Sequence, residues 1–314
     1  MDWYDILLII ICALFFIILL TAYICFRITF YVNRKKDLNK EEFDIPPGEV
    51  YEPYREQMIS WMKEARSMNS VDYYIISFDN LKLHAKYYET KKGNPIEIMF
   101  HGYRGNAERD LCGGIQRAFS LNHNVLLVDQ RTSGESEGNV ISFGVNESKD
   151  CLKWIDFVIN KFGEDQKIIL TGISMGAATV VITSGYDLPK NIVGVLADCG
   201  YSNQKDIIKV CIKKMKLSPT IFYPFVKLGA KVFGHFNLEE VTPIEAIKKS
   251  KIPTIFFHGD ADDFVPHYMS LEMYNAKKEN NKLITIKGAD HGLGFLVDSS
   301  LYIKSMDEFF YGDK

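Results

Sequence analysis

The stretch KIILTGISMGAATVVITSG, residues 167–185, decides the fold. It opens with an apolar run of the length of a buried strand, and after Gly176 small and apolar residues continue at helical length. Between the two runs, GISMG fits the G-x-S-x-G pattern, in which a serine stands on a sharp turn from a strand into a helix. The stretch therefore predicts a strand, a tight turn at Ser174 and a helix.

A second copy of the pattern, GESEG at residues 134–138, lies in the segment LLVDQRTSGESEGN. Its Ser136 also follows an apolar strand, but only after the residues QRTS, and Glu135 and Glu137 flank it. Two adjacent carboxylates would oppose the negative charge that develops on an acyl-transfer intermediate. We therefore interpret Ser136 as a loop residue and Ser174 as the candidate nucleophile.

Short apolar runs alternate with helical patterns through the body of the chain. VDYYIISF and LKLHAKYY, separated by Asp79-Asn80, predict a β-hairpin. We expect further strands at residues 96–100, 124–129, 167–172, 192–198, 252–259 and 282–287, and helices at residues 107–121, 146–162, 175–185, 267–279 and 299–310. Nearly continuous apolar strands separated by helices are typical of a mainly parallel twisted sheet with helices on both faces. The expected fold class is α/β.

An insertion of about 50 residues, 200–250, breaks this alternation, because an ordinary crossover needs only about a dozen residues. It is rich in apolar and aromatic side chains, among them Phe222, Tyr223, Phe225 and Phe236. We expect it to form a helical cap over a pocket. The alternative is that it simply packs on the body.

The N-terminus predicts a transmembrane anchor over residues 1–32. Ile6 to Phe26 carries no charge, and its 21 residues are long enough to cross a hydrocarbon core of roughly 30 Å. A cleaved signal peptide would need a basic segment before the apolar one, whereas two acids precede this span. The basic residues all follow it, so the positive-inside rule places the rest of the chain in the cytoplasm: Arg27, Arg34, Lys35 and Lys36.

Composition completes the domain plan. Residues 33–51 are polar and charged and end in Pro46-Pro47-Gly48, which predicts a tether leading to a hydrolase-like body over residues 52–314. The formal net charge of −3 offers no field for gathering nucleic acid. Six cysteines without C-x-x-C spacing indicate no zinc or redox site, and free thiols suit a reducing compartment.

A serine hydroxyl needs a base, and the base needs an acid to hold it. On this architecture the expected chain order is serine, acid, histidine. His291, in KGADHGLGF, follows the last predicted strand, where a loop can return its imidazole to the carboxyl edge of the sheet. Other histidines precede the serine, lie in the insertion or begin a helix: His84, His123, His235 and His267.

The acid is sought in HGDADDFVP, residues 258–266, just past the end of a predicted strand. Asp260, Asp262 and Asp263 are the candidates, and residue spacing alone leaves the choice among them open. A solvated acidic turn, or a cluster at a helix N-terminus, would also account for them.

The tetrahedral intermediate needs an oxyanion hole, made by the N–H after the nucleophile and one from the loop after an earlier strand. These are the N–H groups of Met175 and Tyr103, the latter in HGYRG at residues 101–105. Gly102 lets that backbone pass close to the site. We interpret His101 as a brace for the loop rather than a second base.

Together these motifs resemble the α/β-hydrolase superfamily, in particular hydrolases grouped with serine aminopeptidase-like and Bem46-like proteins, over roughly residues 52–310. The motifs are HGYRGN, DQRTSGESEG, GISMG, HGDADDFVP and DHG. The resemblance implies an α/β-hydrolase fold with Ser174 as nucleophile and His291 as base. The family pattern H-G-x-x-D-x-x-V-P implies that Asp262 is the acid.

The resemblance also accounts for GESEG, as the tail of a structural loop with the pattern D-x-R-G-x-G-x-S-x-G. This chain departs from the pattern at Thr132, where glycine is usual, and at Ser133, where a bulkier residue is common.

The expected function is hydrolysis of an ester or thioester of an apolar acyl group through an acyl-enzyme on Ser174, without a metal or organic cofactor. A serine peptidase acting on small peptides uses the same chemistry and stays open, as does a non-catalytic binding protein of the same fold. The expected partners are a small acyl or peptide substrate and, through the N-terminal helix, a membrane.

Overall fold

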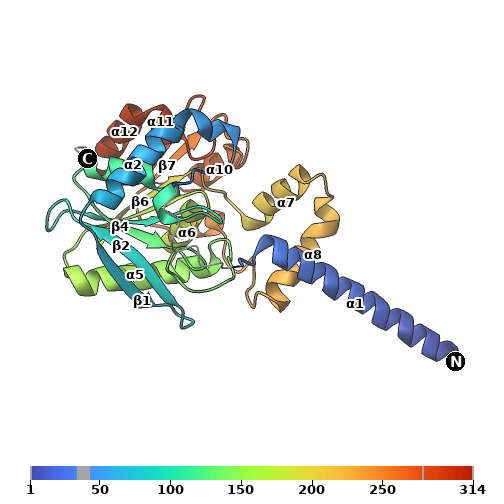
Figure 1. Cartoon of the computed structure of the whole chain (residues 1–314). Coiled ribbons are helices and arrows are strands. Elements are labelled where there is room, and N and C mark those ends of the chain that lie inside the picture. Colours follow the sequence, from blue (N-terminus) through green and yellow to red (C-terminus); the bar gives the residue numbers. More distant parts are fainter. Residues whose placement is uncertain (1, 34–42, 278, 313–314) are drawn as a thin grey trace.

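One eight-stranded sheet organises the body of the chain, in the order β1-β2-β4-β3-β5-β6-β7-β8 (Figure 1). The computed structural model describes residues 2–33, 43–277 and 279–312. β1 and β2 form the predicted hairpin and pair antiparallel, β2 also pairs antiparallel with β4, and every later neighbour pairs in parallel. The strands are β1 Val71–Ile76, β2 Lys82–Tyr88, β3 Ile96–Phe100, β4 Asn124–Asp129, β5 Ile168–Ile173, β6 Ile192–Asp198, β7 Thr254–Gly259 and β8 Asn281–Ile286.

Helices cover both faces of this sheet. One face packs against α5 (Val145–Phe162), α6 (Met175–Ser184), α9 (Pro243–Lys249) and α10 (Tyr268–Ala276). The other packs against α2 (Arg55–Ser67), α3 (Ala107–Asp110), α4 (Cys112–Ser120), α11 (Gly294–Val297) and α12 (Ser299–Tyr311). The central strands are buried along almost their whole length, as expected from their nearly continuous apolar sequence. The α/β-hydrolase fold expected from the sequence is confirmed.

The predicted helix over residues 107–121 is broken. It divides into α3 and α4 at Leu111, whose ψ of 13° leaves the helical region. α4 restarts on the pair Gly113 and Gly114, which are weak helix formers. The break leaves the Asp110 carboxylate beside the loop that follows β3, where its Oδ2 accepts a hydrogen bond from the Gly102 N–H at 3.1 Å.

The N-terminal helix α1 (Trp3–Thr29) projects away from the body, with the N-terminus at its far end (Figure 1). Among the described residues it is the helix long and apolar enough to cross a membrane, with a mean hydropathy of 3.1. Length and composition are the grounds for calling it a candidate span.

The insertion at residues 200–250 forms α7 (Gln204–Lys214), α8 (Pro219–Val232) and α9. α8 packs across the C-terminal part of α1, and the two share an apolar cluster that includes Phe26, Phe30, Val226, Ala230 and Phe236. Figure 1 shows α7 and α8 on the side of the body from which α1 projects, with α8 beside the C-terminal part of α1.

Candidate active site

Ser174 stands on the turn between β5 and α6, in the backbone conformation that the motif predicts. Its φ of 56° and ψ of −116° are strained for a residue with a side chain. A Cβ added to Gly172 would lie 2.1 Å from the carbonyl oxygen of Gly176, and one added to Gly176 would lie 2.0 Å from that of Phe100. Only glycine fits on either side, because the strand and the helix meet backbone to backbone.

The structure brings three predicted site residues into contact. Oγ of Ser174 lies 2.9 Å from Nε2 of His291, and Nδ1 of His291 lies 2.8 Å from Oδ2 of Asp262. They stand after β5, β8 and β7, and the carboxyl ends of these parallel strands meet at one edge of the sheet. The arrangement is a hydrogen-bonded chain from a carboxylate through an imidazole to a hydroxyl.

Asp262 is singled out from its two neighbours by its contacts. Its Oδ1 accepts the N–H groups of Phe264 and Val265, at 2.9 and 2.8 Å. Burial alone would raise the pKa of this carboxyl, but hydrogen bonds from His258 and His291 outweigh burial and hold the pKa well below its usual range. The carboxylate is therefore ionised and able to orient an imidazole.

The other two aspartates have different roles. Asp260 accepts the N–H of Gly288 at 2.6 Å, which ties the turn after β7 to the turn after β8. The Asp263 side chain is exposed and lies 3.4 Å from Nζ of Lys214. Neither carboxylate contacts His291, so the geometry selects Asp262.

The loop after β3 passes directly beside Ser174. A Cβ added to Gly102 would lie 3.5 Å from Cβ of Ser174. Among the described residues, the N–H groups of Tyr103 and Met175 donate to no acceptor. Both predicted oxyanion donors are thus available to a substrate.

His101 braces this loop, as the sequence indicated. It is buried, and its Nε2 accepts the Gln130 N–H at 3.1 Å. Nδ1 therefore carries the proton and donates to the Gly102 carbonyl at 2.8 Å. With both ring nitrogens occupied, His101 does not compete with His291.

The same loop holds the end of the N-terminal helix. The hydroxyl of Tyr103 donates to the Thr29 carbonyl at 2.8 Å, and Arg104 donates to the carbonyls of Ile28 and Tyr31 at 2.8 and 3.1 Å. The last carbonyls of a helix lack intrahelical partners and require such donors. The end of α1 and the candidate oxyanion loop are therefore one hydrogen-bonded unit.

A pocket of about 210 Å³ opens beside the Ser174 hydroxyl. It is lined mostly by apolar side chains, and its members are Pro46, Pro47, Tyr51, Met58, Gly102, Tyr103, Arg109, Asp110, Ile173, Ser174, Phe264, His291 and Gly292. None of these belongs to the 200–250 insertion, which packs on α1 and on the body. Of the two interpretations of the insertion, packing describes it better than a cap over this pocket.

The pocket wall contains a segment that the sequence did not indicate. Pro46, Pro47 and Tyr51 come from the predicted tether, of which residues 34–42 lie outside the described residues. Ile45 is buried, and the hydroxyl of Tyr51, in the short helix η1 (Glu49–Tyr54), donates to the His291 carbonyl at 2.9 Å. The run Ile45-Pro46-Pro47, apolar inside a polar segment, is the signal that could have found it.

Charges in the pocket wall are paired with each other. Nε of Arg109 lies 2.8 Å from Oδ1 of Asp110. Apart from these two residues and His291, the described lining carries no ionisable group except the phenols of Tyr51 and Tyr103. The pocket therefore presents no unpaired carboxylate that would bind the free amino group of a peptide.

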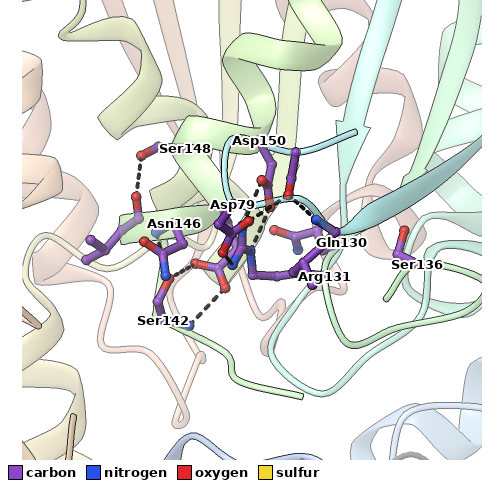
Figure 2. Close-up of polar contacts among 12 residues, drawn as sticks. Asp79, Gln130, Arg131, Ser136, Ser142, Asn146, Ser148 and Asp150 are labelled. Carbon is purple, nitrogen blue, oxygen red and sulfur yellow. Dashed lines mark hydrogen bonds and ion pairs between the residues drawn. The ribbon is translucent and has the colours of Figure 1, made fainter. Parts of the chain in front are cut away.

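Ser136 is buried, and its hydroxyl helps to hold its loop. Its Oγ accepts the His84 N–H at 2.8 Å and donates to the Asp129 carbonyl. Figure 2 shows the neighbouring Arg131 joined to Asp79 and Asp150, with Ser136 to one side of this cluster. Within the described residues Ser136 contacts no base, which agrees with its interpretation as a loop residue.

Three side chains near Ser174 are of the types that bind metal ions. Ligand atoms of Cys199, Asp262 and His291 all lie within 4.8 Å of one another. Burial raises the pKa of the Cys199 thiol well above its usual range, so without a bound cation the thiol is protonated. Both nitrogens of His291 already have hydrogen-bond partners. The donor set fits proton transfer better than metal binding.

Comparison with known proteins places this geometry in a family. Residues 140–312 match the prolyl oligopeptidase family (Peptidase_S9). The chain is 26% identical to the uncharacterized protein YqkD of Bacillus subtilis over 213 residues, 68% of this chain and 70% of that one. It is also 26% identical to the protein bem46 of Schizosaccharomyces pombe, over 57% of this chain and 54% of that one.

Solved structures share the fold. The esterase Pf2001 of Pyrococcus furiosus is similar with a TM-score of 0.65 and 22% identity, over 85% of this chain and 95% of that one. Est1E of Butyrivibrio proteoclasticus is similar with a TM-score of 0.58 and 20% identity, over 76% and 96%. The superfamily expected from the sequence is confirmed, and the family match covers more than half of the chain. The chain belongs to the prolyl oligopeptidase family of the α/β-hydrolase superfamily and is a hydrolase.

Proposed function

We propose that the chain is a membrane-anchored serine hydrolase that cleaves an ester or thioester of an apolar acyl group. The contact of His291 with both Ser174 and Asp262 carries the proposal. This is the constellation that activates a hydroxyl for acyl transfer.

The proposed mechanism follows from these contacts. Nε2 of His291 takes the hydroxyl proton as Oγ of Ser174 attacks the acyl carbonyl, and then gives it to the leaving oxygen or sulfur. Ionised Asp262 holds the Nδ1–H of the imidazole and stabilises its positive charge. The N–H groups of Tyr103 and Met175 bind the oxyanion. Water then attacks the acyl carbon as His291 takes its proton, and His291 returns that proton to Oγ of Ser174 as the bond from Oγ to the acyl carbon breaks and the acid leaves.

The pocket favours an uncharged acyl group. Its wall is built mainly from Pro46, Pro47, Met58, Ile173 and Phe264, which offer apolar contact and little hydrogen bonding. A serine peptidase remains the second candidate, because the matched family is the prolyl oligopeptidase family. The lack of an unpaired carboxylate in the described pocket argues against a substrate with a free amino terminus.

A substrate panel tests the substrate class. The purified full chain is assayed on p-nitrophenyl esters of increasing acyl length, on acyl-CoA thioesters and on aminoacyl amides. We expect a preference for esters or thioesters of short to medium acyl chains, as a pocket of about 210 Å³ would accept. A higher kcat/KM on the amides would overturn the esterase assignment in favour of a peptidase.

We further propose the domain plan of an anchor over residues 1–32, a connecting segment over 33–51 and a catalytic domain over 52–314, with the catalytic domain on the cytoplasmic side. Arg27, at the end of α1, supports this orientation, and Arg34, Lys35 and Lys36 follow it in the sequence. Protease digestion of sealed vesicles of known orientation tests it. Loss of the body from inverted cytoplasmic-membrane vesicles is expected, and loss from right-side-out vesicles would reverse the assignment.

A further inference from the structure

The part of α1 that precedes its contact with α8 is shorter than the hydrocarbon core of a bilayer. Asp5 is ionisable, so the part of the helix suited to hydrocarbon begins at Ile6. From Ala22 onward, α1 is buried on one side by α8. Residues 6 to 21 are 16 residues, which at 1.5 Å per residue span about 24 Å, against roughly 30 Å of hydrocarbon. If α1 crosses a bilayer, as proposed above, the hydrocarbon reaches the level of α8.

α1 and α8 pack closely enough to fix their relative position. A Cβ added to Gly229 would lie 2.5 Å from the Ala22 carbonyl oxygen and 3.0 Å from Cβ of Phe26. The ring of Phe233 also lies 6.0 Å from that of Phe26 and 5.2 Å from that of Tyr23, between centroids. Backbone-to-backbone packing fixes the height of α8 on the anchor.

The insertion that contains α8 exposes apolar side chains. Met215 and Leu217, in the turn from α7 into α8, are 55% and 40% exposed, Ile221, in the first turn of α8, is 59% exposed, and Val232 is exposed at the end of α8. We call these four residues with Lys213, Lys216 and Lys231 the insertion surface. In water such a grouping of large apolar side chains is unfavourable, at about 25 cal/mol for each Å² exposed.

The charges within this stretch of sequence have one sign. Between Ile207 and Leu238 the sequence contains no acid and six lysines: Lys209, Lys213, Lys214, Lys216, Lys227 and Lys231. Lys214 and Lys227 pair with Asp263 and Glu239. The three lysines of the insertion surface lie within ion-pair distance of no described carboxylate. A basic rim around apolar residues is the pattern of segments that lie in a membrane interface.

We propose that the insertion surface docks on a lipid bilayer containing anionic head groups, with Met215, Leu217 and Ile221 entering the boundary between head groups and acyl chains. α1 delivers the surface to that depth, and the lysines bind the lipid phosphates or carboxylates. The anchor and the insertion then form one membrane-binding unit, and the hydrolase body rests on the bilayer instead of hanging from it by a tether.

Lipid-depth quenching on the full chain tests this proposal. Cys12 and Cys211, the cysteines that are not buried, are first replaced by alanine. Single cysteines then replace Ile221, Phe15 on α1, or Ile76 on β1, and each carries an environment-sensitive fluorophore. Ile76 is a matched control, because it is 59% exposed, as Ile221 is. The protein is reconstituted in phosphatidylcholine vesicles, with or without phosphatidylserine, containing lipids with a nitroxide on the acyl chain.

We expect the label at position 221 to be quenched several-fold more than the label at 76, and more strongly with phosphatidylserine present. Replacing Lys213, Lys216 and Lys231 by glutamine should remove the effect of phosphatidylserine. Gly229→Leu, which separates α8 from α1, should lower quenching at 221 but not at 15. The label at 15 reports the anchor alone.

Two outcomes overturn the proposal, and they differ. Strong quenching at 15 with equal, weak quenching at 221 and 76 would leave the anchor in place and refute docking; in that case a protein partner would have to cover the surface. Weak quenching at all three positions would refute both the anchor and the docking. Neither result bears on the hydrolase chemistry, which the substrate panel tests separately.

Discussion

Two segments of this chain share the pattern G-x-S-x-G and use it in opposite ways. In GISMG, the glycines are required because a strand and a helix touch, and the serine is left on a strained turn with its hydroxyl facing His291. In GESEG, Gly134 and Gly138 are required because their φ values of 50° and 100° turn a loop. There the serine hydroxyl hydrogen-bonds with the backbone of His84 and Asp129. The same residue spacing therefore occurs in a nucleophile turn and in a structural loop, and the secondary structure on either side distinguishes the two.

The largest expected difference between the two serines is in catalysis. Ser174→Ala should lower kcat by about 10⁵-fold to 10⁶-fold and abolish labelling by a fluorophosphonate probe, because the nucleophile is lost. Ser136→Ala should keep both activity and labelling while the protein stays folded. Labelling of the folded Ser174→Ala protein at another serine would contradict the proposed nucleophile.

The contact with Asp262 should have the next largest effect. Asp262→Asn should reduce kcat by about 10⁴-fold with KM little changed, because the amide no longer fixes the imidazole tautomer. Asp263→Asn, which alters an exposed carboxylate in the same turn, is the control and should keep activity. Equal losses in the two variants would refute the assignment of the acid.

The lowered pKa of Asp262 also predicts a pH effect on stability. An acid whose pKa is lower in the folded protein stabilises the fold at pH values above about 4, its unfolded value. That contribution is lost as pH falls from there towards the folded pKa. The difference in unfolding free energy between wild type and Asp262→Asn should therefore shrink below about pH 4, in chemical denaturation measured as a function of pH.

The glycines of the two segments should differ in folding stability. Gly176→Ala should cost more than about 3 kcal/mol or prevent folding, because its Cβ would meet the Phe100 carbonyl. Gly138→Ala should cost only about 1–3 kcal/mol, since it places a side chain at positive φ beside a flexible leucine. Thermal unfolding compares them, and equal costs would remove the distinction drawn above.

A smaller effect is expected from Ser136 itself. Ser136→Ala should lower the unfolding free energy by about 1–3 kcal/mol, because the buried N–H of His84 loses its acceptor. Ser60→Ala, at an exposed position on α2, is the control and should change stability by less than about 0.5 kcal/mol. A neutral Ser136→Ala would show that the loop does not depend on this hydroxyl.

The smallest effect is a gain. Thr132 replaces the glycine usual in this loop, yet it adopts a φ of 76°, a strained value for a β-branched residue. Thr132→Gly should raise stability by up to about 1 kcal/mol, since relief of strain exceeds the added flexibility of the unfolded chain. Ser133→Gly, which removes a hydrogen bond to the Gly105 carbonyl, should lower it instead.

Local patterns predicted most of the sheet. The structure has the strands at residues 96–100, 124–129 and 192–198 with the predicted bounds, because each is a continuous apolar run between clear breaks. Because parallel strands end at one edge, the turns that hold Ser174, His291 and the three aspartates were predictable neighbours, whereas the choice of Asp262 rested on the family pattern. The catalytic role of Ser174, Asp262 and His291 stays a prediction until the variants are measured.

Contacts between distant segments were not predictable in this way. The placement of Pro46, Pro47 and Tyr51 in the pocket wall depends on residues more than 200 positions away, such as His291. The packing of α8 on α1 likewise depends on the shape of Gly229 and on aromatic rings in both helices. Neither has a period or a motif, so composition indicated only that the insertion was apolar and that residues 33–51 were polar.

The hydrogen bonds from Tyr103 and Arg104 to the last turn of α1 have a practical consequence for anyone who shortens this protein. A version beginning at residue 33 would take the acceptors away from both side chains and remove Phe30, whose ring lies 5.7 Å from that of Phe143, between centroids. The backbone whose amide would hold the oxyanion would lose its support. Rates measured on such a truncated enzyme would then understate those of the intact one, even in a detergent-free assay with a freely soluble ester.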